Sequence, residues 1–195
     1  MQPQGQPHST CLRLGEPVPP FEAISHLGPV KLADYRGKWL VLFSYPADFT
    51  PVCTSEVVAF SRIHDGLKSQ GCALLGLSTD SVAQHLPWLQ AIENWMGEVI
   101  RFPVIGDANG KLAHAYGLVM PGLSPLQAAR CTLVIDPDQV LQAFIAYPSN
   151  VGRDVEEVLR LVKALQTTQG KHVATPANWQ PDDLLISLST PAANC

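Results

Sequence analysis

A cysteine at position 53 stands where its neighbours favour a reactive thiol. In "SYPADFTPVCTSE", Thr50 and Pro51 follow a short apolar segment and precede Cys53. Threonine followed by proline is typical of a helix start, because threonine can cap the first turn and proline loses no hydrogen bond at the first helical position. Cys53 then lies in the first turn, where free backbone N–H groups and the helix dipole favour an anion such as a thiolate.

A thiolate in such a turn attacks electrophilic sulfur or oxygen. Disulfide oxidoreductases place a Cys-x-x-Cys pair at a strand-to-helix junction, but here Thr50 occupies the first of those positions. A dithiol switch within the motif is therefore excluded. One nucleophile with a hydroxyl three residues upstream suits a peroxide, which converts a thiolate to a sulfenic acid. The alternative is that Cys53 is a small buried hydrophobe near a helix start.

Strands and helices alternate around this motif. Short apolar runs at 39–45 and 72–78 predict buried strands. The spacing of Phe60, Ile63 and Leu67 predicts a helix over 51–69. Further helices are predicted at 81–97 (capped by Ser81 and broken or kinked at Pro87), 109–118 and 153–168, and two more strands at 131–136 and 140–147, joined by a hairpin turn. The pattern predicts an α/β fold with a central mixed sheet flanked by helices, followed by an extended tail from about residue 170.

Composition narrows the class of protein. The chain has 195 residues, 46% of them hydrophobic, and a net charge of −4, which indicates one domain with a substantial core. The sequence has no stripe of basic residues, so nucleic acid is not an expected partner. No apolar run approaches the roughly 20 residues that a membrane helix needs. Five scattered cysteines and an N-terminus without a secretory pattern predict a reducing, cytoplasmic location. The six histidines show no metal-ligand spacing, so no metal or organic cofactor is expected.

Pro46, Thr50 and Cys53 fit the P-x-x-x-T-x-x-C signature of peroxiredoxins. The segments "LGLSTD", "FPVIGD", "RCTLVIDP", "YPSNVGRDVEEVLRLVKALQ" and "KHVATPANWQP" follow in the order and spacing of that family, over roughly residues 12–185. The chain therefore resembles the AhpC/TSA family, and the last two segments resemble its one-cysteine branch. Two-cysteine members carry a resolving cysteine in a "V-C-P-A-x-W" segment, where this chain has Ala174 and Thr175.

The resemblance implies a role for four residues. Cys53 is expected to attack the terminal peroxide oxygen, and Thr50 to hydrogen-bond and orient the peroxide, although helix capping competes for the same hydroxyl. Pro46 is expected to shield the thiolate from water. Arg130 matches the active-site arginine of the family, whose permanent charge stabilises the thiolate and the leaving oxygen.

Glu56 and Arg153 match polar positions of the family and are expected to position Arg130, with an ordinary salt bridge as the alternative. Two departures limit what the resemblance implies. Tyr45 stands where one-cysteine members usually have histidine, so the role of that histidine is not carried over. Lys38 stands where some relatives have the serine of a lipase-like motif, so no phospholipase activity is assigned.

The resemblance also implies domains and partners. It predicts a thioredoxin-like peroxiredoxin domain (11–168) and a C-terminal extension (169–195), while the polar composition of residues 1–10 predicts a disordered leader. The expected partners are a peroxide, an external thiol reductant of thioredoxin or glutathione type, and a second copy in a homodimer or larger ring. Two alternatives stay open: Cys195 as a resolving cysteine, and a chaperone-like holdase role of the oligomer. Cys72 and Cys131 lie in apolar strands and are expected to be core residues.

Overall fold

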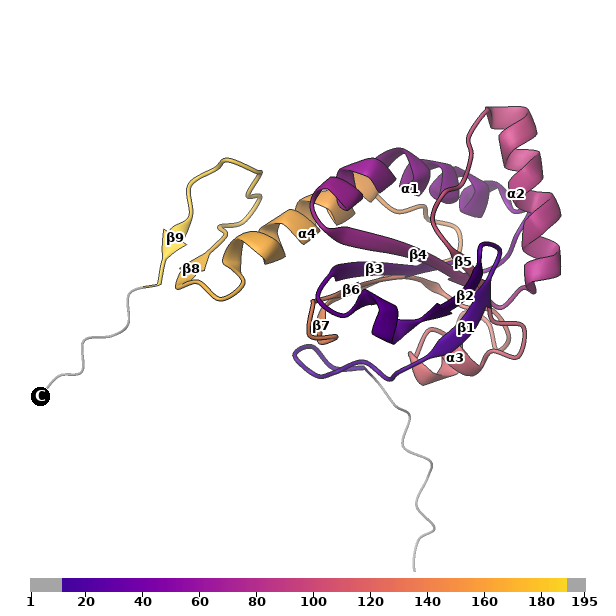
Figure 1. The fold of residues 1–195 in the computed structure, drawn as a ribbon, viewed down its shortest axis with the longest axis horizontal. Helices are drawn as coiled ribbons and strands as arrows, with labels where there is room; N and C mark the ends of the chain where they lie inside the picture. The colour runs from indigo at the N-terminus through magenta and orange to yellow at the C-terminus, as the bar shows by residue number, and fades with distance from the viewer. Residues whose placement is uncertain (1–11, 189–195) are drawn as a thin grey trace, which may run out of the picture. The chain divides into compact units, whose positions relative to one another are not determined.

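The computed structural model describes residues 12–188. The chain forms two compact units, and the boundary between them in the sequence falls between Arg153 and Asp154. The first unit contains a seven-stranded sheet, and the second contains one helix and a two-stranded sheet (Figure 1). The predicted leader, Cys11 and Cys195 lie outside the described residues. Within residues 12–188, no helix combines the length and apolar character needed to cross a membrane.

The large sheet is mixed, as predicted. Its strands are β1 (Glu22–Ser25), β2 (Gly28–Lys31), β3 (Trp39–Ser44), β4 (Cys72–Ser78), β5 (Val104–Gly106), β6 (Arg130–Ile135) and β7 (Leu141–Tyr147), in the order β2-β1-β5-β4-β3-β6-β7. Strands β3, β4 and β5 are parallel, and the other pairs are antiparallel. This order places β6 directly beside β3, the strand that leads into the cysteine motif.

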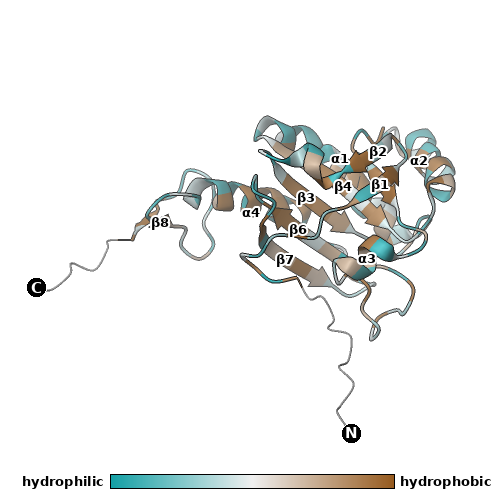
Figure 2. Ribbon diagram, turned by 60° about the horizontal axis from the view of Figure 1, so that its bottom comes forward, coloured by the Kyte–Doolittle hydropathy of each residue, from teal (hydrophilic) through white to brown (hydrophobic). Residues whose placement is uncertain are grey.

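Core packing covers both faces of the central strands, which explains their continuous apolar sequence (Figure 2). All six residues of β3 are buried. On one face, Phe43 stacks on Phe60 of helix α1 (Pro51–Ser69) with 3.9 Å between ring centroids. On the other face, Leu40 and Leu42 belong to a cluster with Leu112 of the short helix α3 (Lys111–Ala115). Helices α1 and α2 (Val82–Met96) lie over one face of the sheet and α3 over the other (Figure 1).

Most predicted elements of the first unit are present, with differences at short or proline-containing segments. Strands β1, β2 and β5 have only three or four residues, and a four-residue 3-10 helix (Leu32–Tyr35) follows β2; none of these was predicted. Pro87 does not break α2, which continues from Val82 to Met96. A capping box formed by Ser81 and Gln84 starts this helix, and buried Trp88 in the turn containing Pro87 packs it onto the domain.

The second unit begins with helix α4 (Val155–Thr168). The N-cap residue Asp154 accepts a hydrogen bond from the Glu157 backbone N–H through its side chain. The following tail was predicted to be extended, but it also contains a small antiparallel sheet of β8 (Val173–Ala174) and β9 (Ile186–Ser187). The indole of Trp179 donates to the Asp183 carbonyl within this segment, at 3.2 Å. No sequence pattern predicts a side-chain hydrogen bond of this kind, so the structure within the tail was not expected.

Candidate active site

Cys53 lies in the first turn of α1, as the sequence predicted. Thr50 occupies the N-cap position with extended backbone, and Pro51 is the first helical residue. The Thr50 hydroxyl, however, makes no capping bond: it donates to the Ala47 carbonyl at 3.0 Å. The expected competition between capping and another use of this hydroxyl is therefore absent in this structure.

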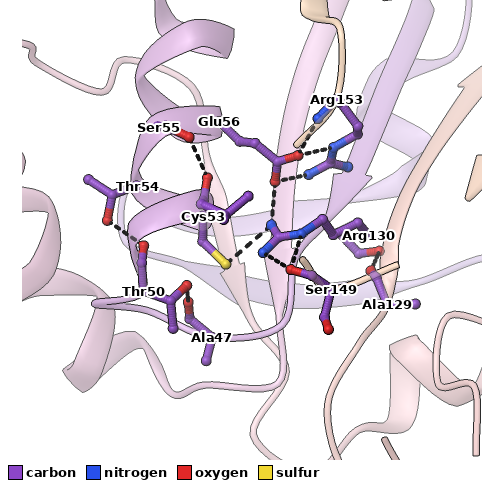
Figure 3. Close-up of polar contacts among 12 residues, drawn as sticks. Ala47, Thr50, Cys53, Thr54, Ser55, Glu56, Ala129, Arg130, Ser149 and Arg153 are labelled. Carbon is purple, nitrogen blue, oxygen red and sulfur yellow. Dashed lines mark hydrogen bonds and ion pairs between the residues drawn. The ribbon is translucent and has the colours of Figure 1, made fainter. Parts of the chain in front are cut away.

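Arg130 reaches the sulfur of Cys53 from the neighbouring strand (Figure 3). It is the first residue of β6, and its Nη1 atom lies 3.4 Å from Cys53 Sγ. Both residues are buried, with relative exposures of 2% for Arg130 and 0% for Cys53. Two further nitrogens of the guanidinium group, Nε and Nη2, donate to the Ser149 carbonyl at 3.0 and 2.8 Å. The arginine is thus held on two sides, with its remaining nitrogen directed at the thiol.

Glu56 links Arg130 to a second buried arginine. Its Oε2 atom lies 2.6 Å from Arg130 Nη1 and 2.8 Å from Arg153 Nη2. Its Oε1 atom accepts from the Arg153 backbone N–H at 2.9 Å and from Arg153 Nε at 2.8 Å. This forked pairing fixes the plane of the Arg153 guanidinium group, which also lies 5.3 Å from the ring centroids of Phe43 and Phe60.

The charges of this cluster favour an anion beside it. Burial raises the pKa of Glu56, but the hydrogen bonds and charge of Arg153 and the charge of Arg130 outweigh burial, and the pKa lies below its usual value. Glu56 is therefore ionised at neutral pH. Two guanidinium groups and one carboxylate leave one net positive charge in a buried site, and the Cys53 sulfur lies 3.4 Å from Arg130 Nη1 within it.

A pocket of about 230 Å³ lies over the start of α1, and its lining includes Pro46, Thr50 and Arg130 but not Cys53 itself. Gln127 and Ser149 also line it, and sequence reasoning found neither residue. The only local signal for Gln127 was its place three residues before Arg130. Ser149 contacts Arg130 through its backbone carbonyl, so its side-chain type carried no signal.

The other described cysteines are far less suited to nucleophilic chemistry. Burial raises the pKa of Cys72 to about 12 and that of Cys131 to about 11. Both thiols are therefore neutral at physiological pH and pack in the core, as predicted. Tyr45, which replaces the expected histidine, is also buried, and its hydroxyl donates to Asp48 Oδ1 at 3.0 Å. Burial and the charge of Asp48 raise the Tyr45 pKa well above its usual value, so it stays a neutral donor.

Two protein families match successive parts of the sequence. Residues 14–144 match the AhpC/TSA family, and residues 164–194 match the C-terminal domain of 1-Cys peroxiredoxin. A peroxiredoxin of Aquifex aeolicus is 48% identical over 171 residues, which cover 87% of this chain and 77% of the relative. Peroxiredoxin 2 of Caldanaerobacter subterraneus is 44% identical over 172 residues, covering 88% of this chain and 78% of the relative.

Solved structures agree with this fold. A cysteine-to-serine variant of peroxiredoxin 6 from Arenicola marina has a TM-score of 0.82 and 39% identity, covering 88% of this chain and 81% of its own. The yeast mitochondrial 1-Cys peroxiredoxin has a TM-score of 0.83 and 39% identity, covering 89% and 85%. These matches confirm the thioredoxin-like fold and the peroxidase class predicted from the motif. The chain belongs to the AhpC/TSA family and is a peroxiredoxin similar to the one-cysteine branch.

Proposed function

We propose that this peroxiredoxin reduces hydrogen peroxide and organic hydroperoxides through a thiolate on Cys53, which becomes a sulfenic acid and is recycled by an external thiol. The observation that carries the proposal is the 3.4 Å contact between Arg130 Nη1 and Cys53 Sγ within a buried cluster of net positive charge. Such a cluster stabilises a thiolate more strongly than the same charges in water, because the surrounding dielectric is low.

The chemical step is a displacement at oxygen. The Cys53 thiolate attacks the terminal oxygen of the hydroperoxide, an S–O bond forms, and the O–O bond breaks. The leaving oxygen takes the bonding pair and, from solvent, one proton equivalent to the one that the thiol released on ionising. It departs as water or an alcohol and leaves Cys53 as a sulfenic acid. Arg130 is a fixed donor next to both the attacking sulfur and the developing negative charge, so it lowers the barrier without reorganisation.

Thr50 and Pro46 form the substrate side of the proposed site. Both line the pocket beside Arg130, and the Thr50 hydroxyl, which now donates to Ala47, is available to turn towards a bound peroxide. Because Cys53 has no exposed surface, an entering peroxide must displace atoms of this wall to reach the sulfur. Pro46 keeps water from the thiolate in the absence of substrate. Glu56 and Arg153 orient Arg130, and their charges together with that of Arg130 make up the net positive charge of the cluster.

Recycling is proposed to use a thiol from outside the chain. The buried thiols of Cys72 and Cys131 are unsuited to attack a sulfenic acid, because attack requires an accessible thiolate. The solved yeast mitochondrial 1-Cys relative is described as resolving its thiol through glutathione and thioredoxin systems. By analogy, a thiol of either type attacks the sulfenic sulfur here and releases water, and a second thiol then frees Cys53. The family resemblance favours a homodimer, or a larger ring, as the working assembly.

The experiment that tests this function combines activity with mass spectrometry. Reduced wild-type protein should consume peroxide in the presence of a thiol, and Cys53→Ser should lose essentially all of this activity, because a serine hydroxyl has almost no anionic fraction at neutral pH. After one equivalent of peroxide, a sulfenic-acid trap should label Cys53 alone. Substantial turnover by Cys53→Ser, or labelling of another cysteine first, would overturn the assignment.

A further inference from the structure

A buried network anchors the loop that carries Pro46 and Thr50. Asp48, in the middle of this loop, points its carboxylate into the protein, and its side chain is only 4% exposed. One oxygen, Oδ2, lies 2.8 Å from Nδ1 of His85, and the other, Oδ1, accepts from the Tyr45 hydroxyl at 3.0 Å. The backbone N–H of Asp48 donates to Asp80 Oδ2 at 2.7 Å. The loop is thus anchored through one residue at three points.

His85 is completely buried and makes a hydrogen bond through each ring nitrogen. It lies in the first turns of α2, and its Nε2 atom is 3.1 Å from the Ile105 carbonyl of β5. The Ile105 carbonyl and the Asp48 carboxylate are both hydrogen-bond acceptors. Each contact with a ring nitrogen therefore needs a proton, so both form only when Asp48 and His85 together hold two protons. In that state the pair connects the loop to both α2 and β5.

The anchored residue is followed by a strained turn. Phe49 has a φ of 56°, in the left-handed region that a bulky aromatic residue rarely adopts. The residue is 58% exposed, so core packing does not offset the cost. Strain of this kind persists only where the surroundings determine the backbone on both sides. Here the Asp48 contacts hold one side, and the start of α1 at Thr50 holds the other.

We propose that Asp48 and His85 are positioning residues for the oxidation of Cys53: their pairing holds the strained Phe49 turn and so places Thr50 beside the sulfur. The inference rests on the function proposed above, because it concerns the geometry of the peroxide step. The hydrogen bonds of Asp48 and His85 run to Tyr45, Asp80 and Ile105 and not to Cys53 or Arg130, so the pairing acts on the orientation of the peroxide and not on the charge around the thiolate. Without it, Phe49 relaxes to an ordinary conformation and Thr50 shifts away from Cys53.

Two substitutions of His85 separate positioning from general stability. The amide nitrogen of asparagine reaches the place of Nδ1, so His85→Asn keeps the donor to Asp48 and loses the Ile105 contact. The amide of glutamine reaches the place of Nε2, so His85→Gln keeps the Ile105 contact and loses Asp48. Each variant buries one amide and removes one hydrogen bond. The bond lost in His85→Gln is the one to a carboxylate and costs more stability, so it is the comparison with Cys53 alkylation below that separates positioning from general destabilisation.

The measurement compares two reactions of Cys53 in each variant. We expect His85→Gln to slow oxidation by hydrogen peroxide roughly 10- to 100-fold, since small misplacements of orienting groups have effects of that size. His85→Asn should stay within about threefold of wild type. Alkylation of Cys53 by iodoacetamide, which needs no oriented peroxide, should be unchanged or faster in both. Equal peroxide rates in the two variants, or a parallel loss of both reactions in His85→Gln, would overturn the proposal.

Amide hydrogen exchange tests whether His85 anchors the loop, and this test does not depend on peroxidase activity. The segment 46–50 should exchange faster in His85→Gln than in His85→Asn or wild type; equal exchange in all three would refute the anchoring. If wild type is not oxidised by peroxide, the proposed function fails while the exchange comparison still decides the anchoring. If neither His85 variant folds, Asp48→Ala, which removes the carboxylate from His85 and Tyr45 alike, should slow the peroxide step far more than Tyr45→Phe, and equal effects would overturn the proposal.

Discussion

The Nη1 atom of Arg130 lies 3.4 Å from the Sγ atom of Cys53, although 77 positions separate the two residues in the chain. The antiparallel pairing of β6 with β3 produces this contact. The chain leaves β3 and enters α1, whose first turn contains Cys53, and β6 begins with Arg130. The same arginine nitrogen contacts Glu56, one turn further along α1 than Cys53. Removing Arg130 therefore tests the electrostatics of the site most directly.

Arg130→Met should keep the fold and slow the peroxide step by about 10²–10³, because losing one preorganised charge in a water-poor site costs about 2–4 kcal/mol. Stopped-flow measurement of Cys53 oxidation checks this. Arg160→Met is the matched control, since Arg160 pairs with Glu157 outside the site and its loss should leave the rate unchanged. A change of less than about threefold in Arg130→Met would show that this arginine is not part of the reaction.

Glu56→Gln should lower the free energy of unfolding at pH 7 by on the order of 3 kcal/mol, because it leaves two buried arginines without their shared counter-charge. The folded-state pKa of Glu56 lies below its ordinary value of 4.5, so its stabilisation is present above that value and is lost as pH falls through the folded pKa. Urea unfolding between about pH 3 and 7 should show the two proteins converging towards acid.

Glu157 provides the control for that pH dependence. Its pKa is also lowered, first by its hydrogen bond to Arg160, but its side chain is 39% exposed. Solvent screening makes such pairs weak, so Glu157→Gln should change the unfolding free energy by well under 1 kcal/mol. A Glu56→Gln protein as stable as Glu157→Gln throughout the pH range would contradict the importance of the buried cluster.

Alkylation of the native, reduced protein near neutral pH should leave Cys72 and Cys131 unmodified while Cys53 reacts. Burial raises the pKa of the first two thiols to about 12 and about 11, so almost none of either is a thiolate under these conditions. Mass spectrometry of peptides before and after denaturation measures the pattern. Cys72→Ser and Cys131→Ser should retain peroxidase activity, with a stability loss from burying a hydroxyl.

Recycling by an external thiol predicts that Cys53 forms no disulfide within the chain. Cys195 is the internal rival, since it ends a stretch of small, polar and proline residues. Non-reducing electrophoresis after one equivalent of peroxide should show the same bands for wild type and for a chain ending at Asn194. A Cys53–Cys195 disulfide in wild type, together with faster overoxidation of the shortened chain, would establish the two-cysteine alternative.

The sequence by itself determined the features that depend on residues close together in the chain. The strands at 39–45 and 72–78 and the start of α1 at Pro51 followed from apolar runs and from the threonine–proline pair. The P-x-x-x-T-x-x-C signature, supported by motifs in the same order, was sufficient to identify the family, and it made Cys53 the candidate nucleophile. Each of these signals acts within a few residues, so it survives without knowledge of the tertiary fold.

Only the tertiary structure decided which distant residues meet. The order of strands in the sheet placed Arg130 beside Cys53. Packing of α2 against the domain placed His85 within hydrogen-bonding distance of Asp48, 37 positions away in the chain. The Thr50 hydroxyl could not be assigned from sequence either, because a threonine hydroxyl at a helix start can accept from the first turn or donate to a nearby carbonyl, and the loop geometry places the Ala47 carbonyl in reach. A strand as short as β5 has too few residues to show an alternation of apolar and polar side chains. It forms because it pairs with the longer neighbouring strand β4.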